Sequence, residues 1–337
     1  MSHATTIKHL LKRGALVAAA NWEVVLLQFV AETAFKLLLV VPVIGAAFLV
    51  ALLVGGSALD LATADAQEIL AALLTAFSDH PAAVLVYAAG LLVVLVGGSL
   101  LTFLVKGGTV ATLVAGDSQA RAIEQLPVRL GTVMRASVFR LDEFMLASGR
   151  LFQRYVKLGA LLGLAYVVIG AFYLTLVFWS YRAVAAVGAT AAWTTTAAVI
   201  SGTVVLIITA VNLLYLLLQI AVAVDNCSVQ DAVKRVSAFL RAEAVTVGML
   251  FVTLLVIVGF ATAGSILGMA GLGVIGFVPV LGLAVFPVQL AAWVFQYLVF
   301  QYLGLSALTA YLHLYRLHRA GEQHLESTAI SIVMRPA

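Results

Sequence analysis

The stretch that decides the fold is 227–243, which reads CSVQDAVKRVSAFLRAE. It separates two segments that contain no Asp, Glu, Lys or Arg, residues 183–224 and residues 244–312. A helix needs about 20 consecutive apolar residues to cross a membrane. The first segment therefore suffices for one crossing after a turn of small residues, and the second for two. The charged stretch between them is expected to lie outside the hydrocarbon core.

Composition extends this argument to the whole chain. Of the 337 residues, 64% are hydrophobic and 10% are charged, whereas ordinary globular domains are about 25% charged. A net charge of +4 is too small and too scattered to favour nucleic acid, and the single Cys227 excludes an internal disulfide. The predicted fold class is all-α: a polytopic membrane bundle of six transmembrane helices with amphipathic interfacial helices.

Three further charge-free stretches, 37–59, 81–105 and 158–181, supply one crossing each. The predicted membrane domain is 32–315, with spans at about 33–56, 82–105, 158–180, 195–222, 244–266 and 286–308. Three, eight, three and three of the 19 Lys and Arg residues fall in 1–21, 106–157, 225–243 and the segment after Tyr315. Because Lys and Arg favour the cytoplasmic side, both termini, the amphipathic loop 106–157 and the basic tail 316–337 are expected in the cytoplasm of a bacterial inner membrane. Three spans in 244–312 would instead move the tail outside.

The stretch 227–243 itself predicts an interfacial helix over 228–241. Ser228 is a candidate N-cap with Asp231 in the capping-box position, and Asp231 and Arg235 form an (i, i+4) pair. At helical spacing, one face is apolar (Val229, Ala232, Val233, Val236, Phe239, Leu240) and the opposite face is polar (Gln230, Lys234, Ser237, Arg241). The apolar face would lie against acyl chains or neighbouring spans, and the basic face toward anionic headgroups. A solvated connector explains the same pattern.

Two more segments combine basic and apolar residues in this way. The N-terminal segment 1–31 reads as an amphipathic interfacial helix, which we expect to be retained rather than cleaved, because its apolar run is short and leads directly into Trp22-Glu23. In the loop 106–157, three basic residues share one helical face just before the third span. The candidate residues for headgroups or a partner are Lys8, Lys12, Arg13, Arg150, Arg154, Lys157, Lys234 and Arg241. One order of features occurs twice, at Asp117 and at Asp225: a span is followed by an aspartate, a small polar residue and an amphipathic basic helix. This similarity is too slight to indicate duplication.

A few polar residues lie within the apolar segments. Glu32 and Lys36 are spaced for an ion pair, either interfacial or part of a coupling site for ions. The fourth span places Asn212, Tyr215 and Gln219 on one face, and the sixth places Gln289 and Gln296 on one face. Such groups either bond between helices or line a route for an amphiphile. No metal or cofactor is expected, since His313, His318 and His324 fit no ordinary zinc spacing.

Several of these pieces resemble a bacterial group. A basic start runs into Asn21-Trp22, the next span contains Pro42, the fourth span ends in AVAVDNCSVQDAVKRVSAFLR, and the sixth ends in ALTAYLHLYRLHRAGEQHL. Together they resemble the membrane domain of glycerophosphoryl diester phosphodiesterases and related six-helix bacterial membrane proteins of unknown function. The resemblance implies the fold and a lipid environment. It does not imply hydrolysis, because no segment is long enough for a soluble catalytic barrel.

The sequence thus favours a non-enzymatic membrane scaffold or accessory subunit that engages anionic lipid, a membrane protein partner, or both. A transporter or permease for a lipid-like molecule is the alternative, and a lipid-modifying enzyme a third possibility. No nucleic-acid partner is expected, and the oligomeric state is left open.

Overall fold

The computed structural model describes residues 3–54, 78–79, 81–125, 127, 129–185, 190–276 and 279–333. Within these ranges all regular structure is helical, which confirms the all-α prediction. The helices are α1 (His3–Ala20), α2 (Trp22–Val54), α5 (Pro81–Gln119), α6 (Leu130–Ala136), α7 (Leu141–Ala185), α8 (Thr190–Asp225), α9 (Val229–Gly276) and α10 (Pro279–Val333). Helices α2, α5, α7, α8, α9 and α10 are long and apolar enough to cross a membrane, so the described chain is that of a multi-pass membrane protein. The cytoplasmic placement of both termini stays a prediction.

The chain divides into two compact units. Unit 1 comprises Met1–Leu26 and Lys106–Ala337, and unit 2 comprises Leu27–Val105. Within unit 2, α2 and α5 approach closely at Gly98, where a Cβ would lie 1.9 Å from Cδ2 of Phe35. Gly98 therefore permits this contact, and a larger residue would displace the Phe35 ring.

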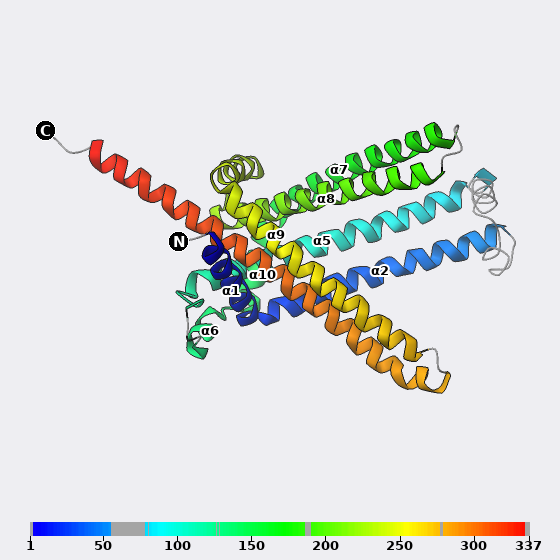
Figure 1. The fold of residues 1–337 in the computed structure, drawn as a ribbon, viewed down its shortest axis with the longest axis horizontal. Helices are drawn as coiled ribbons and strands as arrows, with labels where there is room; N and C mark the ends of the chain where they lie inside the picture. The colour runs from blue at the N-terminus through cyan, green and yellow to red at the C-terminus, as the bar shows by residue number, and fades with distance from the viewer. Residues whose placement is uncertain are drawn as a thin grey trace. The chain divides into compact units, whose positions relative to one another are not determined.

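Unit 1 is built from three helix pairs. Helix α1 packs on α10, α7 on α8, and α9 on α10. Helices α7 and α8 run side by side over much of their length, and so do α9 and the first part of α10 (Figure 1). The crossing of α1 and α10 is tight, because a Cβ on Gly14 would lie 2.4 Å from the backbone oxygen of Ser306. The short N-terminal helix is thus held against the last helix of the chain.

Side chains of unit 1 are buried where the helices carry charge, and exposed where the helices are most apolar. The largest fully buried side chains include Leu113 of α5, Tyr155 of α7, Leu217 of α8, Phe239 of α9 and Tyr315 of α10. Large apolar side chains further along the same helices are exposed, among them Phe172, Val205, Phe260 and Phe295. A water-soluble protein would bury such residues. Their exposure here matches a surface that faces acyl chains.

Three helix boundaries differ from the sequence prediction. The N-terminal helix was expected to run to residue 31, but α1 ends at Ala20 and α2 begins at Trp22. The interfacial helix and the fifth span are joined in α9, with only a kink at Glu243 (φ −114°, ψ 23°) between them. Helix α10 has 55 residues and continues through the expected tail to Val333.

The break at Asn21 has a clear physical cause. The Asn21 side chain is fully buried, and its amide donates hydrogen bonds to the backbone oxygens of Val17 (3.0 Å) and Ala136 (2.8 Å). Its Oδ1 accepts a hydrogen bond from the Val138 amide. Because both side-chain polar atoms are satisfied by distant backbone groups, Asn21 fixes the turn between α1 and α2 against the segment 136–138.

Candidate functional site

The first cluster of the candidate site forms around Asp117, near the C-terminal end of α5. Its carboxylate is 1% exposed and lies 2.6 Å from Nε of Arg13 in α1 and 2.7 Å from Nη1 of Arg316 in α10. Nδ1 of His313 lies 3.2 Å from the same carboxylate. A buried charge is stable only when it is paired and hydrogen-bonded, and Asp117 meets this condition with partners from two other helices.

Arg13 completes the first cluster. Its side chain is 6% exposed, and besides Asp117 it pairs with Glu124 at 2.8 Å. It also donates to the backbone oxygens of Asp117 (2.9 Å) and Arg121. Arg121 has a positive φ of 43°, the left-handed conformation that often ends a helix. Arg13 therefore stabilises both the acid on α5 and the turn that follows α5.

A second cluster forms around Asp225, the last residue of α8. Its carboxylate is 9% exposed, accepts a 2.6 Å hydrogen bond from the Tyr315 hydroxyl and lies 2.7 Å from Nη1 of Arg235. Nε of Arg319 lies 3.5 Å away. The next residue, Asn226, has a positive φ of 46°. The second aspartate of the sequence repeat thus also lies at a helix end, and it pairs with Arg235 of the next helix, α9, and lies near Arg319 of α10.

Helix α10 joins the two clusters. His313 and Arg316, one turn apart, contact Asp117, whereas Tyr315 and Arg319 contact Asp225. Two adjacent faces of one helix therefore receive the ends of α5 and α8. The arrangement fixes the positions of these helix ends through charge-assisted hydrogen bonds, which are the stronger class of hydrogen bond in proteins.

The start of α9 docks on the same part of α10. The Ser228 cap is confirmed, since the Asp231 amide donates to Ser228 Oγ at 3.2 Å and the Ser228 hydroxyl donates to Asp231 at 2.7 Å. Phe239 is fully buried and packs edge-on against Tyr315, with ring centroids 5.3 Å apart. The predicted apolar face therefore packs on α10 at Phe239, and Ala232 and Val236 of the same face are buried as well.

One local pairing was predicted incorrectly. The sequence spacing suggested an ion pair between Asp231 and Arg235, but the guanidinium of Arg235 pairs with Asp225. Asp231 is exposed, whereas the Asp225 side chain is 9% exposed. Charges attract more strongly where water is excluded, so the buried acid is the preferred partner.

The predicted basic residues divide into outward-facing and internal ones. Arg13 is buried inside the first cluster, so its side chain is not available to a lipid headgroup. Arg154 and Lys12 are half-buried, and Nη1 of Arg154 donates a 2.6 Å hydrogen bond to Oδ1 of Asn226. The side chains that are exposed are those of Lys8, Arg150, Lys157, Lys234 and Arg241.

The polar residues predicted on α8 and on α10 have different surroundings. The Tyr166 hydroxyl of α7 donates to Oδ1 of Asn212, while Nζ of Lys106 lies 5.6 Å from the ring centroid of Tyr215. Gln219 is buried, and its backbone oxygen accepts a hydrogen bond from the Tyr155 hydroxyl at 3.0 Å. Thus the face on α8 contacts α5 and α7. Gln289 and Gln296 of α10 are half-buried, and Gln296 lies in a separate groove between α9 and α10.

Glu32 and Lys36 both lie on α2 in unit 2, one turn apart. Oε1 of Glu32 accepts a 3.2 Å hydrogen bond from Gln28, and Lys36 is exposed. An ion pair between Glu32 and Lys36 stays a prediction. Among the described residues no three His, Cys, Asp or Glu side chains gather as a metal site would require.

Sequence reasoning identified neither cluster as a site. It marked Asp117 and Asp225 as a repeat but assigned them no partners, and it placed Arg316 and Arg319 in a disconnected tail. The available signal was the position of each aspartate directly after a long apolar segment. Asn21, which is fully buried, gave no signal beyond its place before Trp22.

Comparison of this chain with protein-family models, curated proteins and solved structures finds no match.

Proposed function

We propose that this chain is a non-enzymatic, multi-pass membrane scaffold or accessory subunit that engages anionic phospholipid. Its setting would be a bacterial inner membrane, with both termini in the cytoplasm. The proposal depends on one observation: around the two clusters the acidic side chains are buried, whereas several basic side chains are exposed. Asp117 and Asp225 are 1% and 9% exposed and are already paired with arginines, whereas Lys157 and Lys234 are exposed.

This division leaves a positive surface. The two enclosed aspartates are neutralised by their partners, so the exposed cations near them make the local surface potential positive, although the net charge of the chain is only +4. Each Lys or Arg near an anionic membrane contributes about 1 kcal/mol of attraction, which decays within a Debye length. Several such residues on helices held by ion pairs give a marked preference for anionic lipid without a deep binding pocket.

The alternative of a permease has less support. A route along α8 would need polar side chains that face a common opening. The amide oxygen of Asn212 already accepts a hydrogen bond from Tyr166, and Tyr215 and Gln219 are buried against other helices. These contacts are typical of polar residues that hold spans together.

The proposal can be tested with two double variants on and beside α7. Arg150→Gln/Lys157→Gln removes two exposed cations from the proposed surface. Arg140→Gln/Arg182→Gln is the matched control: Arg140 already pairs with Asp142 and Glu143, and Arg182 stacks on Phe178 beyond the third predicted span. We would measure the affinity for brominated phosphatidylglycerol relative to brominated phosphatidylcholine by tryptophan quenching.

The first double variant is expected to lose about 30-fold in relative affinity for phosphatidylglycerol, since two cations contribute about 1 kcal/mol each and about 1.4 kcal/mol corresponds to tenfold. The control should change less than twofold, and the wild-type preference should fall as salt is added. Equal preferences in wild type and both variants would refute the proposal. Reporter fusions that place the loop 106–157 and the tail on opposite sides of the membrane would refute the topology on which it depends.

A further inference from the structure

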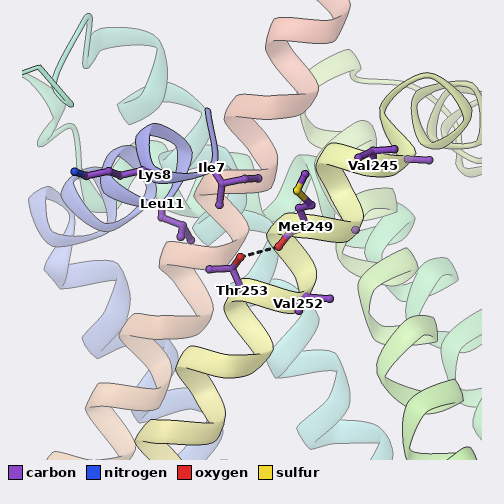
Figure 2. Close-up of a pocket in the computed structure, with 9 residues that line it drawn as sticks. Ile7, Lys8, Leu11, Val245, Met249, Val252 and Thr253 are labelled. Carbon is purple, nitrogen blue, oxygen red and sulfur yellow. Dashed lines mark hydrogen bonds between the residues drawn. The ribbon is translucent and has the colours of Figure 1, made fainter. Parts of the chain in front are cut away.

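An open groove runs between α1 and the part of α9 that follows the kink. It has a volume of about 700 Å³. Its walls are apolar side chains, and Figure 2 shows Ile7 and Val245 at one end and Val252 at the other. The hydroxyl of Thr253 donates to the backbone oxygen of Met249 at 2.8 Å, so this polar side chain turns back on its own helix (Figure 2). The groove therefore offers almost no hydrogen-bonding group to an occupant.

The groove begins directly after the kink in α9, where the helix changes from amphipathic to apolar. The non-helical residue Glu243 separates the amphipathic first turns of α9 from its apolar remainder. Ala244 and Val245, the next two residues, already line the groove, and Val252 and Thr253 line it two turns further on. A molecule bound in the groove would thus have one end near charged residues and the rest against apolar side chains.

The charged end of the groove is positive. Lys8 lines the groove with its methylene stem, and Figure 2 shows its amine directed away from the apolar walls. Lys12 follows one turn later on α1, and the exposed Arg241 lies four residues before Val245. The nearby acid, Glu243, is half-buried and accepts a hydrogen bond from the Thr246 hydroxyl at 3.0 Å. Lys8 at the groove and the exposed Arg241, close in sequence to its lining residues, give this end of the groove a positive charge that complements an anionic group.

We propose that this groove binds one acyl chain of an anionic phospholipid, with the phosphate held at the rim by Lys8 and Arg241. The inference rests on the proposed function and deepens it, because it adds one specific lipid site to a generally cationic surface. Long basic side chains readily extend toward a headgroup while their stems cover apolar surface. Because lipid tails are as apolar as the groove lining, a chain that fills the groove gains van der Waals contact with its walls rather than transfer from water.

Gly248 gives a sharp test of the site. It lines the groove, and a Cβ at this position would meet no atom within 4 Å. Gly248→Leu should therefore fill the groove without disturbing the helix. Gly259→Leu is the matched control, since Gly259 lies on the same helix outside the groove and its Cβ would also meet nothing within 4 Å.

We would titrate phosphatidylglycerol into the detergent-purified full chain and determine the Kd of the first bound lipid by native mass spectrometry. Gly248→Leu is expected to raise this Kd about tenfold, with Gly259→Leu unchanged. Lys8→Gln/Arg241→Gln should abolish the preference for phosphatidylglycerol over phosphatidylcholine while lipid still binds. Unchanged binding in Gly248→Leu, or equal losses in both glycine variants, would overturn the groove as a site, and so would a dimer whose formation Gly248→Leu blocks.

The outcomes of the two tests are separable. If Gly248→Leu binds lipid normally but Arg150→Gln/Lys157→Gln loses its lipid preference, the groove is wrong and the proposed function stands. If Gly248→Leu loses the first lipid while the Arg150/Lys157 variant behaves as wild type, the groove stands and the general surface is wrong.

Discussion

The clusters around Asp117 and Asp225 have the same arrangement, an aspartate paired with basic residues, but they differ in how deeply they are buried. Each aspartate lies at or near the end of a long apolar helix and receives basic residues from α10. Asp117 is 1% exposed and has two arginines and His313 as partners, whereas Asp225 is 9% exposed and has Arg235, Arg319 and a tyrosine hydroxyl. The main difference is the arginine that comes from a helix other than α10: Arg13 of α1 is 6% exposed at Asp117, whereas Arg235 of α9 is 37% exposed at Asp225.

This difference indicates what α1 does in the fold. An amphipathic N-terminal helix with three basic residues looks, from sequence, like a helix that only rests on the membrane surface. In the structure it packs on α10 through Gly14 and ends in the buried Asn21, and Arg13 is buried between α1 and α5. Helix α1 is therefore an integral part of unit 1, and only its remaining cations are available to lipid.

The largest expected effect is at Asp117. Asp117→Ala should lower the free energy of unfolding by about 3–5 kcal/mol, because it leaves the buried Arg13 without its main acidic partner. Asp225→Ala should cost about 1–2 kcal/mol, since its partner Arg235 is 37% exposed and can be solvated. The measurement is equilibrium unfolding in mixed micelles.

Asp142→Ala, in an exposed pair with Arg140, serves as the control, and its free energy of unfolding should change little. Equal losses at positions 117 and 225 would remove the distinction between the clusters.

A smaller effect is expected at Arg13. Arg13→Met keeps most of the side-chain volume but removes the link from α1 to Asp117 and Glu124, and it should cost about 2–3 kcal/mol. Because Asp117 retains Arg316 and His313, the loss should be concentrated in α1. Hydrogen exchange should therefore speed up in α1 more than in α8. The adjacent Lys12→Met is the control, and the same exchange pattern in both variants would contradict the special role of Arg13.

Much of the fold could be predicted from the sequence because the signals were local. Segments without charge predicted the spans, and the Ser228 cap and the buried face with Ala232, Val236 and Phe239 followed from spacing along one helix. These features depend on residues within a few turns of each other. They are therefore visible without knowledge of tertiary contacts.

The candidate site was not predictable in the same way because its contacts join different helices. Lys12 and Arg13 are neighbours with the same charge, yet only Arg13 meets an acid 104 residues away. Arg235 had a suitable partner four residues earlier and still pairs with Asp225. In both cases burial decides which pair forms, and burial depends on how distant helices pack.

A third prediction uses Cys227, the single cysteine of the chain, as a reporter of the second cluster. Cys227 is buried, and burial raises the pKa of its thiol, so reaction with a maleimide should be slow. Asp225→Asn should speed the reaction about tenfold, because it loosens the helix end beside Cys227 and removes a negative charge that disfavours the thiolate. Asp117→Asn should leave the rate nearly unchanged. Acceleration by both variants would mean that the clusters act as one unit through α10.

The smallest effect is expected at Tyr315, which distinguishes the hydrogen bond to Asp225 from the packing around it. Tyr315→Phe removes the 2.6 Å hydrogen bond but keeps the ring that packs against Phe239. Asp225 retains Arg235 and Arg319, so the loss should be about 1 kcal/mol. Phe239→Ala removes the ring contact, leaves the hydroxyl in place and should cost about 3 kcal/mol. Unfolding midpoints in mixed micelles would rank the two variants, and a larger loss in Tyr315→Phe would mean that the second cluster depends on its polar contacts as strongly as the first.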